Sequence, residues 1–164
     1  MPRKIVSRAH IVAAIVGFVV IVSFWTATVL SEVFAGPAAV AAVKSGILIG
    51  MAVLIPALVI AGATGYRLGG KSVGPTVAAK RRRMPFIALN GLLVLVPSAI
   101  FLAGKAARLE FDAAFYAVQA VELAAGGVNI ALMGFNMRDG FRLTQKRRRP
   151  VVRPARSPAV QASS

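Results

Sequence analysis

Six residues in the C-terminal third of the chain have the spacing of one helix face. Successive members lie three or four positions apart: Gln119, Glu122, Gly126, Asn129, Met133 and Asn136. Residues three and four apart share a helix face, so the polar side chains among them form one stripe, here called the polar seam. A charge at the centre of a bilayer costs about 2.5–3.5 kcal/mol, and a buried amide without partners loses its hydrogen bonds. The polar seam is therefore expected to face other helices or water.

Glu122 is the only ionisable member of the polar seam. If residues 84–105 and 112–138 form a helical hairpin, residues equidistant from its turn share a depth. Glu122 is then level with Pro97 and Ser98, and Asn129 is level with Asn90. We expect Ser98 and the backbone carbonyl freed by Pro97 to satisfy Glu122, because proline lacks an N–H. We also expect Asn90 to pair with Asn129, and no Lys or Arg to lie in the layer of Glu122.

An intramembrane carboxyl at position 122 has two interpretations. In the first, Glu122 exchanges a proton or binds a cation while a substrate crosses the membrane. In the second, a protonated Glu122 hydrogen-bonds between helices and fixes their register. For Asn90, Asn129 and Asn136 the interhelical interpretation is favoured, since amides recur in that role.

His10 is the only histidine and precedes the first apolar run. Met84, Met133 and Met137 are expected at the same edge of the bilayer, so a haem with His and Met ligands is conceivable. A symmetric dimer could instead bring two His10 side chains together. The simpler interpretation is an amphipathic side chain among headgroups and ordinary apolar methionines, so we expect no cofactor.

Two basic clusters, one directly before the third apolar run and one after the fourth, are candidates for contact with a membrane surface or a partner. They comprise Lys80, Arg81, Arg82, Arg83, Lys146, Arg147, Arg148 and Arg149. Each favourably placed basic residue contributes about 1 kcal/mol to binding of anionic headgroups. We expect the partners to be anionic lipids, with a second copy or a subunit of a membrane complex as further possibilities. Nucleic acid is not expected, because the basic residues lie between apolar runs and not on one face of a domain.

The composition excludes a water-soluble fold and several kinds of chemistry. Apolar residues make up 57% of the 164 residues, which leaves too little polar surface to cover a soluble domain. Without cysteine the chain has no disulfide, thiolate metal site or thiol nucleophile. The sequence indicates no Ser/His/Asp set, no carboxylate pair in one layer of the membrane and no metal-ligand spacing. We therefore expect the protein not to be an enzyme.

Four segments are long and apolar enough to cross a bilayer about 30 Å thick. We predict an all-α membrane protein whose transmembrane domain, residues 1–144, holds helices at about 10–31, 45–67, 84–105 and 112–138. Pro37 could extend the second helix outward. Pro56 and Pro97 predict kinks. Residues 68–79 are expected to form a loop, Gly140 to end the fourth helix, and residues 145–164 to form a disordered basic tail.

The distribution of Lys and Arg predicts the orientation of these helices. Seventeen lie before the first run, between the second and third runs, or after the fourth, and only Lys44, Lys105 and Arg108 lie in the other two connections. Because basic residues accumulate on the cytoplasmic side, we predict an antiparallel bundle with both termini in the cytoplasm. Cleavage after Ala35 as a signal peptide is an alternative, but the first run exceeds the usual apolar core of a signal. The composition suits a bacterial inner membrane.

The sequence thus favours a small polytopic membrane protein that is a non-enzymatic accessory or interaction subunit of a membrane complex. One alternative is a proton-coupled carrier of small molecules or ions that uses Glu122. Another is a haem-binding electron-transfer subunit that uses His10 in a dimer. The loops are too short to bury a core, so any ligand site is expected between helices or between subunits.

Overall fold

The computed structural model describes residues 2–69 and 75–148, and this part of the chain is entirely helical apart from short connections. The elements are α1 (Arg3–Phe34), α2 (Pro37–Gly69), α3 (Pro75–Asn90), the π-helix η1 (Gly91–Leu95), α4 (Val96–Ala107) and α5 (Ala113–Arg148). Elements α3, η1 and α4 follow one another without a break. The described residues contain four helices long and apolar enough to cross a membrane: Lys4–Phe34, Pro37–Gly69, Arg82–Ala107 and Ala113–Arg142. The predicted all-helical architecture with four such segments is confirmed.

The helices are longer than the apolar runs alone predict. Helix α2 begins at Pro37, as the helix-starting preference of proline suggested, and α3 begins at Pro75, within the expected loop. Gly140 does not end α5, which continues to Arg148 and so includes residues 145–148 of the expected tail. The residues after Gly140 are mostly good helix formers, and the next proline is Pro150. The rest of the expected tail, residues 149–164, lies outside the described residues.

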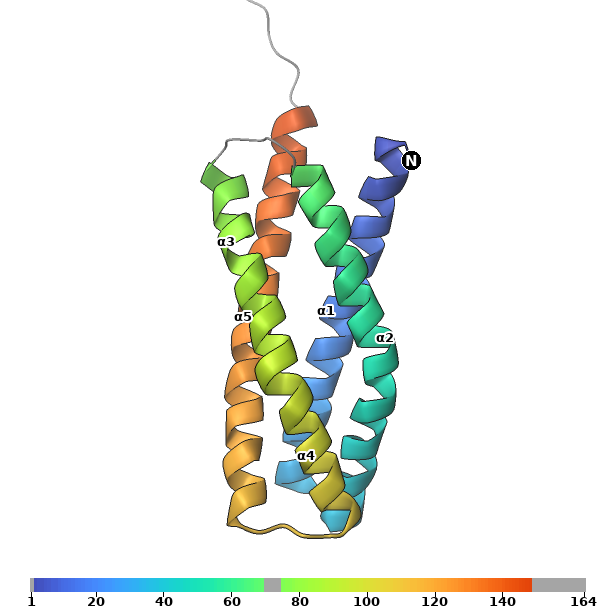
Figure 1. Cartoon of the computed structure of the whole chain (residues 1–164), viewed down its shortest axis with the longest axis vertical. Coiled ribbons are helices and arrows are strands. Elements are labelled where there is room, and N and C mark those ends of the chain that lie inside the picture. Colours follow the sequence, from blue (N-terminus) through green and yellow to red (C-terminus); the bar gives the residue numbers. More distant parts are fainter. Residues whose placement is uncertain (1, 70–74, 149–164) are drawn as a thin grey trace, which may run out of the picture.

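The helices lie side by side as one bundle (Figure 1). Helix α1 packs against α2 and α5, and α4 also packs against α2 and α5. The connections at residues 35–36 and 108–112 lie at the same end of the bundle, here called the connection end, and the N-terminus lies at the opposite end (Figure 1). This arrangement brings the start of α2, the end of α1 and the first turns of α5 to one level.

The third apolar segment changes its helical pitch just before Pro97. The backbone N–H of Val96 bonds to the carbonyl of Gly91, five residues earlier, which closes a π-turn. Pro97 has no N–H to donate, so the regular α-helical hydrogen bonds are already interrupted at this point. The π-turn lies at this interruption. Pro56, by contrast, lies within a continuous α2. The sequence predicted a disturbance at both prolines, and the change of helix type occurs at Pro97.

The packed core lies toward the connection end. Val40, Leu102, Ala106 and Phe115 form one buried cluster, and Ile47, Met51 and Ala99 form a second against which Phe24 packs. Many large apolar side chains along the bundle are exposed, including Ile49, Leu93 and Val128. An outer surface of this kind suits a lipid environment.

Candidate functional site

The most buried charged group in the described residues is Lys44, which is only 1% exposed. Its Nζ donates to Glu122 Oε2 at 2.6 Å, joining α2 to α5. Helix α2 begins at Pro37, so Lys44 lies about 10 Å along the helix at about 1.5 Å per residue. The prediction that no Lys or Arg shares the layer of Glu122 is therefore wrong. Glu122 has a direct counter-charge.

Glu122 has Gln119 as its second partner. Gln119 Nε2 donates to Glu122 Oε2 at 3.2 Å, and both residues come from one face of α5. The expected partner Ser98 is buried on α4, but the described bonds of Glu122 go to Lys44 and Gln119. The assignment of Ser98 and of the backbone carbonyl freed by Pro97 to Glu122 is thus corrected, because the longer α2 supplies a stronger donor.

Two buried oxygens beside this ion pair have no hydrogen-bond partner among the described residues. They are Glu32 Oε1 on α1 and Gln119 Oε1 on α5. Glu32 lies close enough to Lys44 and Glu122 for both charges to act on it. We call Glu32, Lys44, Gln119 and Glu122 the charged cluster. Unpaired buried acceptors are uncommon in folded proteins, so each is a position where a donor is expected.

The expected pair of Asn90 and Asn129, here called the amide layer, is present. Asn90 Nδ2 donates to Asn129 Oδ1 at 3.0 Å and to the carbonyl of Ala125 at 2.9 Å. Asn129 Nδ2 donates to the carbonyl of Ile87 at 3.4 Å. These bonds tie α3 to α5, as the depth match between Asn90 and Asn129 predicted. Asn136 is buried farther along α5, and its Oδ1 has no partner in the described part of the chain.

Trp25 is held against α5 by a hydrogen bond. Its Nε1 donates to the carbonyl of Leu123 at 3.0 Å. A Cβ at Gly126 would lie 3.0 Å from Trp25 Cδ1, so glycine in the polar seam allows this close approach. Trp25 therefore connects α1 with α5 at the level of the charged cluster and the amide layer.

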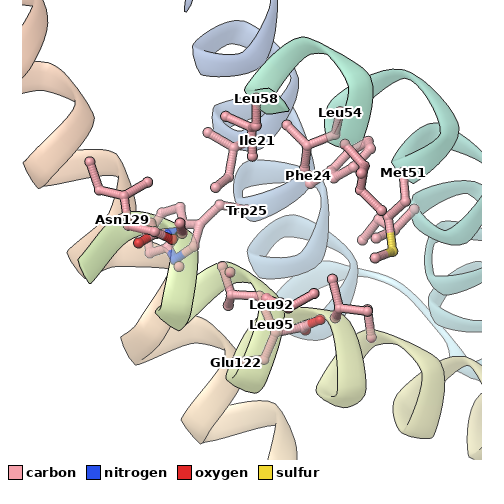
Figure 2. Close-up of a pocket in the computed structure, with 18 of the residues that line it drawn as sticks. Ile21, Phe24, Trp25, Met51, Leu54, Leu58, Leu92, Leu95, Glu122 and Asn129 are labelled. Atoms are coloured by element: carbon pink, nitrogen blue, oxygen red, sulfur yellow. The ribbon is translucent and has the colours of Figure 1, made fainter. Parts of the chain in front are cut away.

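An apolar cavity of about 410 Å³ lies between α1, α2, the segment from α3 to α4, and α5. Figure 2 shows side chains from these helices around it, with Trp25, Glu122 and Asn129 among the labelled residues. Val59 and Leu92 line the cavity from α2 and η1, yet they are 63% and 65% exposed. The cavity is therefore open sideways between these elements, toward the surface that lipid would cover.

The geometry of the cavity resembles that of small-molecule sites. Such sites are about 300–1,000 Å³ and mostly apolar, with a few polar groups that orient the ligand. Here the polar lining groups are Thr28, Glu122 and Asn129, together with the indole of Trp25. Glu122 belongs to the charged cluster, so the cavity has one charged end and a long apolar body.

Lys44 was expected in an external connection, and the sequence predicted neither its burial nor the cavity. A signal for Lys44 existed, because Val40, Lys44, Ile47 and Met51 repeat at spacings of four and three, and all four are buried. A cavity formed by four separate helices has no comparable signal in one segment of sequence.

At the end of the bundle opposite the connection end, His10 packs on α2. Its Nδ1 lies 3.0 Å from the carbonyl of Ala61 and 3.2 Å from Thr64 Oγ1. A Cβ at Gly65 would meet His10 Cε1 at 3.0 Å and Met84 Cε at 3.1 Å, so both side chains flank this glycine. Among the described residues, no group of three or more His, Cys, Asp or Glu side chains could hold a metal ion.

The basic clusters are described only in part. Arg82 is exposed, whereas Arg83 Nη1 donates to the buried Asp139 Oδ2 at 2.7 Å. Arg83 thus ties α3 to α5 within the bundle. The side chains of Lys80, Arg81, Lys146, Arg147 and Arg148, and the whole of Arg149, lie outside the described part.

Comparisons with known proteins give no relative from which a function could be transferred. No protein-family model, no curated protein and no solved structure matches this chain.

Proposed function

We propose that the chain is a multi-pass protein of a bacterial inner membrane with both termini in the cytoplasm and its four spans antiparallel. The distribution of Lys and Arg supports this orientation. The connection end then faces outward, and the charged cluster lies near the outer edge of the bilayer. The basic residues around the opposite end would lie among anionic headgroups.

Within that membrane, we propose that the protein is a non-enzymatic binding component that holds a small amphipathic molecule between its helices. The observation that carries this proposal is the 410 Å³ apolar cavity, which opens toward the lipid-facing surface and ends at Glu122. A ligand could enter from the bilayer without crossing a polar layer. Binding of this kind is the accessory role that the geometry supports best.

The Lys44–Glu122 ion pair favours binding over proton exchange as the use of this site. A carboxylate with an ammonium at 2.6 Å has its charge compensated without a proton. The proton-coupled carrier is therefore the weaker of the two proposals.

Trp25 makes the binding proposal directly testable, because it lines the cavity and is the only tryptophan. The full chain in dodecyl maltoside micelles would be titrated with a neutral brominated alkyl alcohol, since bromine quenches indole fluorescence at short range. We expect saturable quenching of Trp25. A linear rise that follows micelle partitioning alone would contradict the proposal.

Two glycines of α2 provide a matched pair of variants for the same titration. Gly62 lines the cavity, Gly46 does not, and a Cβ at either position meets nothing within 4 Å. Gly62→Leu should fill the cavity and abolish saturable quenching. Gly46→Leu adds the same side chain outside the cavity and should leave the quenching unchanged. Equal effects of the two substitutions would show that the quencher binds elsewhere.

A further inference from the structure

The charged cluster carries an uncompensated negative charge when both of its carboxylates are ionised. Glu32 and Glu122 contribute two negative charges, and Lys44 contributes one positive charge. The nearest lysine on α4, Lys105, pairs instead with Asp112 and Glu110 in the adjoining connection. One further positive charge would neutralise the cluster, whereas an anionic group would meet net repulsion.

The cluster also lacks hydrogen-bond donors. Gln119 is 4% exposed and bonds through Nε2 to Glu122, yet its Oε1 has no partner in the described part of the chain. Glu32 Oε1 is likewise buried and unpaired there. Both described bonds of Glu122 go to Oε2. A group with several N–H donors and a positive charge therefore fits better than a cation without N–H.

One of these acceptors, Glu122, lies at the end of the cavity, and the other two lie just beyond the lining residues. Glu122 lines the cavity itself, and Thr28, which also lines it, is one helical turn before Glu32 on α1. Gln119 is one turn before Glu122 on α5. Glu32 and Gln119 therefore lie one turn beyond the lining residues, toward the connection end.

We propose that the ligand of the cavity is an amphipathic primary amine, whose ammonium group binds among Glu32, Gln119 and Glu122 and whose apolar body fills the cavity. This inference rests on the proposed binding function and adds the class of ligand. The ammonium supplies the missing positive charge and three N–H donors. Trp25, beside Glu122 in the lining, then flanks the first carbons of the apolar body.

The test is competitive displacement of the neutral brominated alcohol from wild-type protein, followed by Trp25 fluorescence. The competitors are unbranched undecyl chains that end in a primary amine, an alcohol, a trimethylammonium or a carboxylate. We expect the amine to displace the quencher at roughly tenfold lower concentration than the alcohol. A tenfold difference in affinity is about what one hydrogen bond to a charged group contributes. The trimethylammonium should be weaker than the amine because it has no N–H.

Glu32→Gln removes the excess charge and leaves the Lys44–Glu122 ion pair in place. We expect this variant to bind the brominated alcohol normally but to lose most of the preference for the amine. Glu110→Gln, in the exposed 108–112 connection, removes one carboxylate away from the cavity and should retain the preference. Should Glu32→Gln not fold, Gln119→Met carries the test, because it removes the unpaired Oε1 acceptor and leaves the Lys44–Glu122 ion pair in place. This variant should also weaken the preference for the amine.

The outcomes separate the two proposals. If wild-type protein does not bind the brominated alcohol saturably, the binding function itself fails. If the alcohol binds but amine and alcohol compete equally, the binding function stands and the amine assignment is overturned. A carboxylate that competes best, or a trimethylammonium equal to the amine, would also overturn the assignment.

Discussion

Lys44 and Glu122 are 78 positions apart in the chain, yet Lys44 Nζ lies 2.6 Å from Glu122 Oε2. The ion pair joins α2 to α5 near the connection end of the bundle, where Glu32 of α1 adds a second carboxylate. Three of the four spans therefore meet at one set of charges, with Lys44 as its only cation. This makes Lys44 the residue whose removal should disturb the bundle most.

Replacing Lys44 by Met should destabilise the folded protein strongly. The substitution preserves side-chain length but leaves Glu122 and Glu32 without a buried counter-charge, which typically costs about 3–5 kcal/mol. Thermal unfolding in detergent, followed by circular dichroism, would measure the loss. Lys105→Met removes a lysine whose partners Glu110 and Asp112 are exposed, and should change the melting temperature little. Equal melting temperatures for Lys44→Met and wild type would show that the ion pair does not support the fold.

Asp112 makes the start of α5 sensitive to acid. Its Oδ2 accepts a hydrogen bond from Lys105 Nζ, and its Oδ1 accepts one from the Phe115 backbone N–H at 2.9 Å. Together, in that order of importance, these bonds hold the pKa of Asp112 below its ordinary value of 3.8. A lowered pKa means that the stabilisation is present above pH 3.8 and is lost as the pH falls through the folded-state pKa.

We therefore expect the Phe115 amide proton to shift in an NMR titration only at a pH below 3.8. Asp112→Asn keeps a side-chain oxygen at the start of the helix but carries no titratable charge. This variant should show no such shift. A Phe115 titration that persists in Asp112→Asn would assign the effect to another group.

The sequence predicts the structure best where a feature is determined by the residues of one segment. Four uncharged or nearly uncharged runs sufficed to predict four spans, because an apolar segment of that length has few other stable environments. The Asn90–Asn129 pair was predictable because hairpin geometry fixes relative depth. The position of Lys44 was not, because a lysine near the end of a span can extend to the headgroups or turn inward. That choice depends on Glu122 and Glu32, which belong to other helices.

The proposed topology predicts which single cysteines are reachable from outside the cell. The chain has no cysteine, so any labelling comes from the single cysteine that is introduced. An impermeant maleimide should label Ala38→Cys and Ala107→Cys in intact cells, and Ser72→Cys and Ser164→Cys only after permeabilisation. If Ala107→Cys is not labelled in intact cells, the predicted orientation of the hairpin formed by α4 and α5 is wrong. A mature N-terminus at Gly36 would instead show that α1 is a removed signal.

Phe24 and Gly50 link the packing of α1 on α2 to the size of the cavity. A Cβ at Gly50 would lie 2.4 Å from Phe24 Cζ, so Gly50→Ala must displace the ring. Phe24 lines the cavity, and the ring can therefore move into that empty volume at little cost. Alanine also gains about 0.5–1 kcal/mol over glycine within a helix. We expect Gly50→Ala to remain folded, with a melting temperature close to wild type, but to bind the brominated alcohol more weakly.

Two further variants distinguish loss of cavity volume from a general effect of alanine in α2. Gly46→Ala gains the same helix propensity without a neighbour within 4 Å, so it should leave quenching of Trp25 unchanged. Adding Phe24→Leu to Gly50→Ala replaces the displaced ring by a smaller side chain and should restore binding. Because both variants retain the charged cluster, a restored affinity would assign the defect to volume. Unaltered binding in Gly50→Ala itself would mean that the Phe24 ring moves away from the ligand, and that this wall of the cavity does not limit its capacity.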